Sequence, residues 1–185
     1  MASNPRKEWV PFFSQTGGEI LNIMKSSMLK PRLVVTNRPE ADVRGLPLHE
    51  HLQRRDIPLL CSFSNESHQY RILFCPDTDI LTLHGYLRIV PAEACDTFEI
   101  YNGHPGDVIK YPELKGKDPQ KKALKLKLES TGCVLHKVTK DLDGGPIIAR
   151  REMYIKPYIT EDLLIEKLKD LMLPLWISLL EEKLS

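Results

Sequence analysis

The chain has 185 residues, which is long enough to bury a hydrophobic core without disulfides or metals to hold it together. Hydrophobic residues make up 42% of it and charged residues 28%, as in an ordinary globular protein, and the formal net charge is +1. This balance gives no reason to expect a nucleic acid or an anionic membrane as a partner. We expect one domain over residues 1–185.

Cysteine usage and the lack of targeting signals favour the cytoplasm. The four cysteines form no Cys-x-x-Cys pair and lie in apolar stretches, so we expect buried thiols in a reducing compartment. The N-terminal segment has no apolar core of signal-peptide length, and no run of 18 apolar residues predicts a transmembrane helix. The cysteines are Cys61, Cys75, Cys95 and Cys133.

The first half of the chain predicts short buried strands that alternate with helices. Strands are expected at 8–14, 32–37 and 57–63, and helices at 19–27 and 48–55. Residues 67–75 are ambiguous, because short apolar runs do not show their period clearly.

The second half continues the alternation. Strands are expected at 80–83, 97–101, 132–138 and 146–154, and helices at 119–128 and 161–184. Thr160 is a plausible N-cap of the last helix, and Pro174 is expected to kink or break it. Strands alternating with helices predict an α/β fold with a mainly parallel twisted sheet and helices on both faces.

Three polar, Gly-rich segments follow predicted strands, at 14–19, 102–107 and 141–145. In parallel sheets ligands usually bind beyond the carboxyl ends of the strands, so these segments are candidates for a site.

Asn102 and His104 are the strongest candidates for chemistry. Two residues apart on an extended segment, they share a face, and both can donate hydrogen bonds to an oxyanion that develops on a carbonyl carbon. Asp143 lies in an acidic Asp-x-Asp-Gly-Gly-Pro turn and could orient a histidine and raise its basicity. Each motif alone is also typical of a solvated turn, so the spacing supports a site but names no reaction.

A resemblance names one. Asn102-Gly103-His104-Pro105 resembles the Asn-x-His-Pro signature of the 10-formyltetrahydrofolate-dependent formyltransferases. The segments 114–116, 123–124 and 131–136 are similar to the glycinamide ribonucleotide branch of that family in order and spacing. Residues 140–148 resemble its folate-loop signature, and 85–90 its pterin-lining segment. The resemblance covers about residues 10–183 and is strongest from 80 to 150.

The resemblance implies a Rossmann-like formyltransferase fold and transfer of a formyl group from 10-formyltetrahydrofolate to a small amine, with glycinamide ribonucleotide favoured. Asn102 and His104 would stabilise the oxyanion, and Asp143 would keep His104 protonated and help remove the proton of the amine. The formyl donor would bind, partly through main-chain groups, at the residues Arg88, Ile89, Val90, Val138, Lys140 and Asp141.

The turn after the first strand departs from that branch, where a similar turn binds the substrate phosphate. Thr16, Gly17 and Gly18 keep a helix N-terminus that could bind an anion. Glu19 stands in place of an asparagine. Its carboxylate either repels a phosphate or points away as a favourable acid of the first helical turn.

Other functions stay open. The acceptor could be an aminoacyl-tRNA or an amino sugar, the reaction could be hydrolysis, or the chain could bind folate or a nucleotide without turnover. In the family that the chain resembles, the tRNA enzymes carry a further C-terminal domain and the deformylases a further N-terminal one, and we expect neither here. A lysine cluster between Lys110 and Lys127 is either a solvated face or an attractor of an anionic ligand. His136 and His84 are interpreted as structural, and no metal-ligand set is found.

Overall fold

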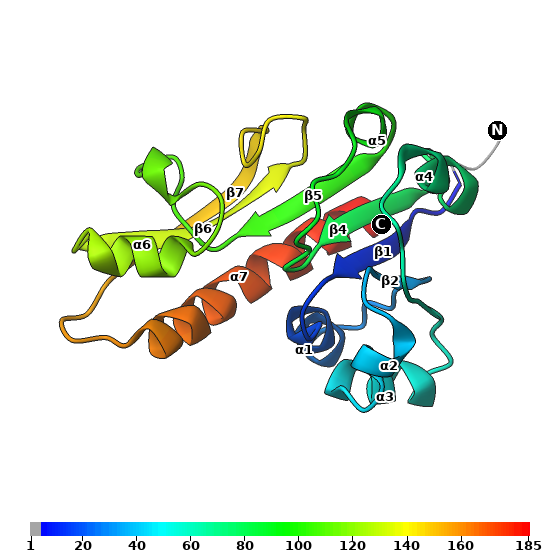
Figure 1. The fold of residues 1–185 in the computed structure, drawn as a ribbon, viewed down its shortest axis with the longest axis horizontal. Helices are drawn as coiled ribbons and strands as arrows, with labels where there is room; N and C mark the ends of the chain where they lie inside the picture. The colour runs from blue at the N-terminus through cyan, green and yellow to red at the C-terminus, as the bar shows by residue number, and fades with distance from the viewer. Residues whose placement is uncertain (1–4) are drawn as a thin grey trace.

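The computed structural model describes residues 5–185 and contains one seven-stranded sheet with the strand order β3-β2-β1-β4-β5-β6-β7 (Figure 1). The strands are β1 (Glu8–Phe13), β2 (Val34–Thr36), β3 (Leu59–Leu60), β4 (Asp79–Leu83), β5 (Glu99–His104), β6 (Ser130–Lys137) and β7 (Ile147–Tyr154). The helices are α1 (Gly18–Ser26), α2 (Glu40–Val43), α3 (Pro47–Arg54), α4 (Ser67–Leu73), α5 (Ala92–Thr97), the 3-10 helix η1 (Pro112–Leu114), α6 (Pro119–Lys125) and α7 (Glu161–Leu184).

Strands β1 to β5 pair in parallel, whereas β6 pairs antiparallel with both β5 and β7. The predicted α/β fold with a mainly parallel sheet is therefore confirmed. Parallel neighbours require crossover connections, which here contain α1, the α2–α3 segment, α4 and α5.

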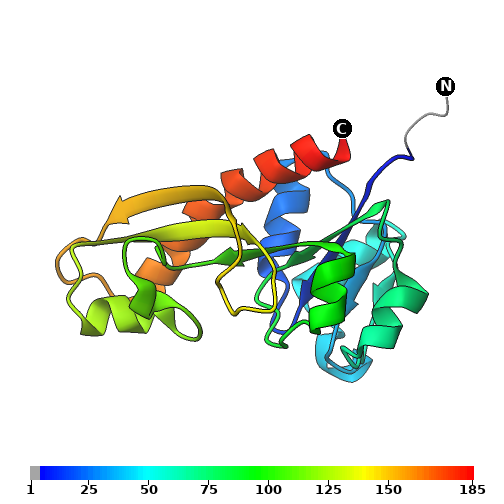
Figure 2. The same cartoon turned by 90° about the horizontal axis from the view of Figure 1, so that it is seen from above.

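Helices cover both faces of the sheet (Figure 2). One face packs against α1, α3 and α7 around Trp9, Tyr101 and Trp176. The other packs against α4 and α5 around Phe12 and Ile100. Because side chains alternate along a strand, successive residues of β1, β4 and β5 contribute to opposite cores.

Helix α7 runs from Glu161 to Leu184 without a break, so the prediction that Pro174 could end it is wrong. A proline in a helix interior costs about 3 kcal/mol. Here the helix buries six apolar side chains, each worth roughly 1.5–3 kcal/mol, which outweighs that cost. They are Leu164, Leu168, Met172, Trp176, Leu179 and Leu180. The predicted N-cap is confirmed, since Thr160 Oγ1 accepts from the Leu163 amide at 3.3 Å.

Several local expectations need correction. The ambiguous segment 67–75 forms helix α4, and two short helices, α2 and α5, were not predicted. Strand β3 has only two residues instead of the expected seven at 57–63. The expectation of four buried thiols is wrong for Cys75, which is exposed, while Cys95 and Cys133 are buried. Among residues 5–185, no helix combines the length and apolarity needed to cross a membrane.

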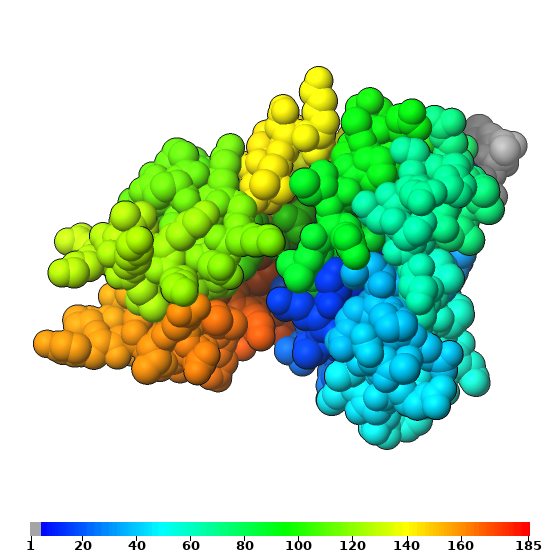
Figure 3. All heavy atoms as spheres, in the orientation of Figure 1, coloured from blue at the N-terminus to red at the C-terminus, as the bar shows by residue number. Residues whose placement is uncertain are grey.

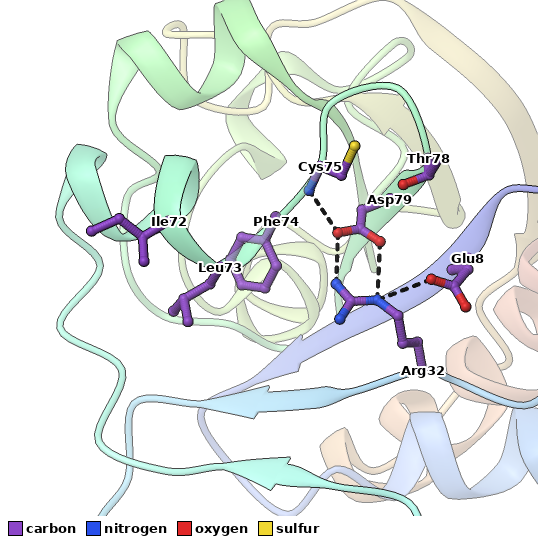
Figure 4. Close-up of a pocket in the computed structure, with 8 residues that line it drawn as sticks. All are labelled: Glu8, Arg32, Ile72, Leu73, Phe74, Cys75, Thr78 and Asp79. Carbon is purple, nitrogen blue, oxygen red and sulfur yellow. Dashed lines mark hydrogen bonds and ion pairs between the residues drawn. The ribbon is translucent and has the colours of Figure 1, made fainter. Parts of the chain in front are cut away.

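A buried ion pair fixes the amino end of β4 (Figure 4). Asp79 is 1% exposed and accepts hydrogen bonds from Arg32 Nη2 at 2.6 Å, from Arg32 Nε at 3.1 Å and from the Cys75 amide at 2.8 Å. Glu8 lies on the solvent side of the same guanidinium, at 3.3 Å. These residues line a cavity of about 300 Å³. The pair joins the segment before β2 to the start of β4, across β1.

Replacing Asp79 by alanine should lower the free energy of unfolding by about 2–3 kcal/mol, because it leaves the guanidinium without its buried partner. The value is below the roughly 3–5 kcal/mol of a fully buried pair because Arg32 is one-third exposed. Urea denaturation measures it. Glu8→Gln is the matched control and should change stability by less than about 0.5 kcal/mol, since that contact is half-exposed. Equal effects of the two changes would contradict this assignment.

Candidate active site

Strand β5 presents Asn102 and His104 on the same face of the sheet. The structure extends β5 through His104, beyond the expected end at residue 101, because β6 pairs with it antiparallel. The register sets Asn102 opposite His136 and His104 opposite Val134. His136 therefore lies beside Asn102 on that face, although the sequence assigned it only a structural role.

Asp143 reaches this face from the loop between β6 and β7. Its backbone has φ of 48°, in the left-handed region, where aspartate is tolerated better than most residues. The loop then returns so close to β6 that a Cβ on Gly145 would lie 1.8 Å from the Lys137 carbonyl oxygen. Only glycine fits there, so the Asp-Gly-Gly sequence determines where the carboxylate lies.

The Asp143 carboxylate is the centre of a cluster that brings the three predicted catalytic residues together. Its Oδ1 lies 3.4 Å from Asn102 Nδ2 and 3.5 Å from His136 Nε2. Its Oδ2 lies 3.3 Å from His104 Nδ1 and accepts from the Gly116 amide at 2.8 Å. His104, His136 and Asp143 are all buried. We call Asn102, His104, His136 and Asp143 the Asp143 cluster.

Within the Asp143 cluster the donors are occupied by protein acceptors. His104 Nε2 donates to the Leu114 carbonyl at 2.9 Å. His136 Nδ1 donates to the Lys137 carbonyl at 3.1 Å, which leaves its Nε2 to accept from Asn102 Nδ2 at 3.1 Å. The bonds between side chains are longer than the ~2.7–2.9 Å of charge-assisted hydrogen bonds. A ligand oxygen can therefore replace one of these acceptors at a small cost in free energy. Long hydrogen bonds of this kind are common in ligand-free sites.

The pKa values of Asp143 and His104 are both lowered, for different reasons. Burial alone would raise the pKa of Asp143, but the contact with His136, the charge of His104 and the Gly116 amide lower it to about 2. The carboxylate is therefore ionised. For His104, burial lowers the pKa, and this outweighs the opposite effects of Asp143 and the Leu114 carbonyl.

The residues expected to bind the formyl donor lie along the same side of the sheet. Val90 and Val138 pack against the core on the α4–α5 face. The remaining four, Arg88, Ile89, Lys140 and Asp141, are exposed. The Val138 amide bonds to Ile100 O at 2.8 Å, which joins the 138–146 loop to β5 just before Asn102.

Three large apolar side chains stand out from these two segments into solvent. Leu87 is 61% exposed, Ile89 75% and Leu142 63%. Leu87 and Leu142 were not among the predicted site residues, although both lie in segments that resemble the donor-binding segments of the family. Leu142 had a signal in the sequence, an apolar residue inside a polar turn, which by itself also fits ordinary surface exposure. These three side chains form an apolar surface against which the rings of a ligand could pack.

The turn before α1 holds the four predicted acceptor-side residues. Gly17 is the N-cap, and the Gly18 amide donates to Thr16 Oγ1 at 3.4 Å. The Glu19 side chain has a partner inside the protein, because its Oε2 lies 2.7 Å from His84 Nδ1. His84 thus has a polar partner that the sequence could not reveal.

A recess lies at the middle of one face of the molecule (Figure 3). It is bordered by the η1–α6 segment in yellow-green, the 138–146 loop in yellow and the blue chain after β1. From the lysine cluster, Lys115 and Lys117 flank Gly116, whose amide binds Asp143. Lys110 instead pairs with Glu152. Two of the lysines therefore lie next to the Asp143 cluster.

Comparison with known proteins shows which family the chain belongs to. A family model described as "Formyl transferase" matches residues 18–178. A methionyl-tRNA formyltransferase of Thermotoga neapolitana is 28% identical over 177 residues, which are 89% of this chain and 54% of that protein. A formyltetrahydrofolate deformylase of Bacillus subtilis is 28% identical over 65% of this chain and 40% of its own length. The chain thus spans about half the length, or less, of these curated relatives.

Among solved structures, glycinamide ribonucleotide transformylase 1 from Geobacillus kaustophilus has a TM-score of 0.81 and 25% identity, and the likeness covers 97% of this chain and 100% of that one. Phosphoribosylglycinamide formyltransferase from Bacillus halodurans has a TM-score of 0.78 at 23% identity, covering 97% and 96%, which shows the shared fold. Because the family model covers most of the sequence, and because Asn102, His104 and Asp143 meet in one buried cluster, this chain belongs to the formyl transferase family.

Proposed function

We propose that this chain transfers the formyl group of 10-formyltetrahydrofolate to a primary amine, with the Asp143 cluster as its catalytic centre. The observation that carries the proposal is the ionised, buried Asp143 carboxylate in contact with Asn102 and His104. The exposed apolar side chains of Leu87, Ile89 and Leu142 suit a flat, partly apolar donor such as a pterin.

Asn102 would stabilise the charge that develops on the formyl oxygen. When the amine nitrogen attacks, this oxygen becomes an oxyanion, and a side-chain amide is a suitable donor to it. The Nδ2 group would exchange its 3.4 Å contact with Asp143 for the oxyanion. His136 would act as a positioning residue, since its Nε2 accepts the second hydrogen of the same group.

His104 would act as the base. A new C–N bond forms as the amine attacks, and the bond from the formyl carbon to N10 of the folate breaks. The attacking nitrogen loses one proton, and N10 gains one. With Nε2–H on the Leu114 carbonyl, Nδ1 of the ring can take the first proton and return it to N10, and the adjacent Asp143 stabilises the imidazolium in between.

Glycinamide ribonucleotide is the reference acceptor. The sequence favours it, and the printed names of the two solved relatives above support trying it first. The curated relatives also include a methionyl-tRNA formyltransferase and a formyltetrahydrofolate deformylase, so a tRNA-borne amine and water are the alternatives. Tetrahydrofolate formation with each acceptor, and without any, distinguishes them.

Asn102→Ala should lower kcat for formyl transfer by about 10²–10³, the usual loss for one oxyanion donor. His104→Ala should lose about 10²–10⁴ through loss of the base. Both variants should bind a stable formyl-folate analogue nearly as well as the unmodified chain. The matched controls are Asn22→Ala on α1 and His68→Ala on α4, both exposed and outside the Asp143 cluster. A non-catalytic binding protein would show no turnover for any of the five proteins.

The pH dependence tests the base. Because burial lowers the pKa of His104, kcat/KM should be constant above the ordinary histidine value of about 6.5 and should fall when pH drops below the lowered value. NMR titration of the His104 ring should give the same pKa, with His68 as an exposed reference in the same sample. If the protonated ring were required, the rate would instead fall as pH rises through this pKa.

A further inference from the structure

The strand order reverses between β1 and β4. From β1 the chain proceeds through β2 to β3 on one side, and from β4 to β5 on the other. In α/β sheets, ligands bind outside the carboxyl ends of the strands at such a reversal. The two chain segments there are the turn from Ser14 to Gly18 after β1 and the bend from His84 to Tyr86 after β4. They are joined by the bond from the Ser14 amide to the Gly85 carbonyl at 3.3 Å.

A carboxylate of the chain itself lies at this reversal. Glu19, in the first turn of α1, reaches across to His84, whose side chain is fully buried, while that of Glu19 is 23% exposed. On its other side, the His84 ring lies 2.9 Å from Thr82 Oγ1, which accepts from Trp9 Nε1 at 2.7 Å. This chain of hydrogen bonds fixes the position of the carboxylate.

Each hydrogen bond of this series joins groups that can pair. Trp9 can only donate to Thr82, and the Glu19 carboxylate can accept from His84 Nδ1. This places the Glu19 carboxylate close to the free amides that begin α1. The N-terminus of α1 would otherwise attract an anionic ligand, but the Glu19 carboxylate already lies beside it.

The same pair packs against the strand that carries the catalytic residues. The Trp176 ring lies 4.4 Å from the His84 ring, centroid to centroid. A Cβ on Gly103 would approach Trp176 to 2.9 Å, so glycine between Asn102 and His104 is what lets α7 fit there. Glu19 and the Asp143 cluster thus lie on opposite faces of the sheet, near the neighbouring ends of β4 and β5.

A cation lies beside the same turn. Arg38, after β2, donates from Nη1 to the Gln15 carbonyl and from Nη2 to the Asp42 carbonyl. These bonds hold the guanidinium against the backbone of the turn and leave its charge in place. Glu19 is therefore the acidic group, and Arg38 the basic group, at this reversal.

We infer that Glu19, held by His84, is a specificity-determining residue that excludes a phosphate from the α1 turn and selects an amine acceptor with a hydroxyl or a second ammonium group there. An amino sugar has this chemistry. The inference rests on the proposed formyl transfer and revises its acceptor, because glycinamide ribonucleotide would bring a phosphate to this carboxylate.

The test is the binding of ribose 5-phosphate, with ribose as the uncharged reference, measured by calorimetry. One unit charge about 5 Å away at an effective dielectric constant of ~20 changes affinity roughly hundredfold, and solvent screening reduces this. Glu19→Gln should therefore bind ribose 5-phosphate at least about tenfold more tightly than the unmodified chain, with ribose unchanged. Glu161→Gln, which removes an exposed first-turn acid from α7, is the matched control and should show no gain. No gain for Glu19→Gln, or an equal gain for both, would overturn the inference.

Turnover separates this inference from the proposed function. The ratio of kcat/KM for glycinamide riboside to that for the ribonucleotide should exceed one in the unmodified chain and fall at least about tenfold in Glu19→Gln. A preference of the unmodified chain for the ribonucleotide, unchanged in the variant, would overturn the role of Glu19 while leaving formyl transfer intact. If no amine is formylated and the formyl-folate analogue does not bind, the proposed function fails, and the ribose 5-phosphate measurement still decides whether Glu19 excludes phosphate.

Discussion

The buried Asp143 carboxylate is the interaction on which the arrangement of the site depends. An ionised carboxylate that is only 8% exposed is costly unless it is paired and hydrogen-bonded. Here its partners come from three separate parts of the chain: Asn102 and His104 on β5, His136 on β6, and Gly116 after η1. Satisfying one charge therefore fixes the relative positions of strands and loops that the hydrophobic core alone leaves free to shift.

The alternation of side chains along the strands divides the functions between the two faces of the sheet. On β5, Asn102 and His104 face the side where Val90 and Val138 pack, whereas Gly103 faces Trp176 on α7. Just after β4, His84 also faces Trp176. Under the proposed function, a formyl donor on the first face and an amine acceptor reaching the end of α1 would meet at the carboxyl end of β5.

The alternation of residues along a strand predicted which side chains share a face of the sheet. The strand period predicted that Asn102 and His104 share one face, as they do in the structure. The role of His136 could not be predicted in this way. It depends on β6 pairing antiparallel with β5 in a register that brings His136 opposite Asn102, and pairing partners are not encoded in a local period.

Long-range packing also explains the other differences. Pro174 fits inside α7 because the buried residues around it hold the helix against the sheet. The lowered pKa of His104 follows from burial by segments far away in the chain, which an aspartate motif in the sequence does not reveal. The contact of Glu19 with His84 could not be predicted either, because His84 follows a different strand.

The most direct test of the account is a crystal structure of the chain with a stable formyl-folate analogue bound. We predict that the formyl oxygen lies within hydrogen-bond distance of Asn102 Nδ2, that Asn102 has released Asp143, and that the pterin contacts the main chain of residues 88–90 and 138–143. An analogue bound elsewhere, for example in the cavity beside Arg32, with the Asp143 cluster unchanged, would contradict the assignment of this cluster as the catalytic centre.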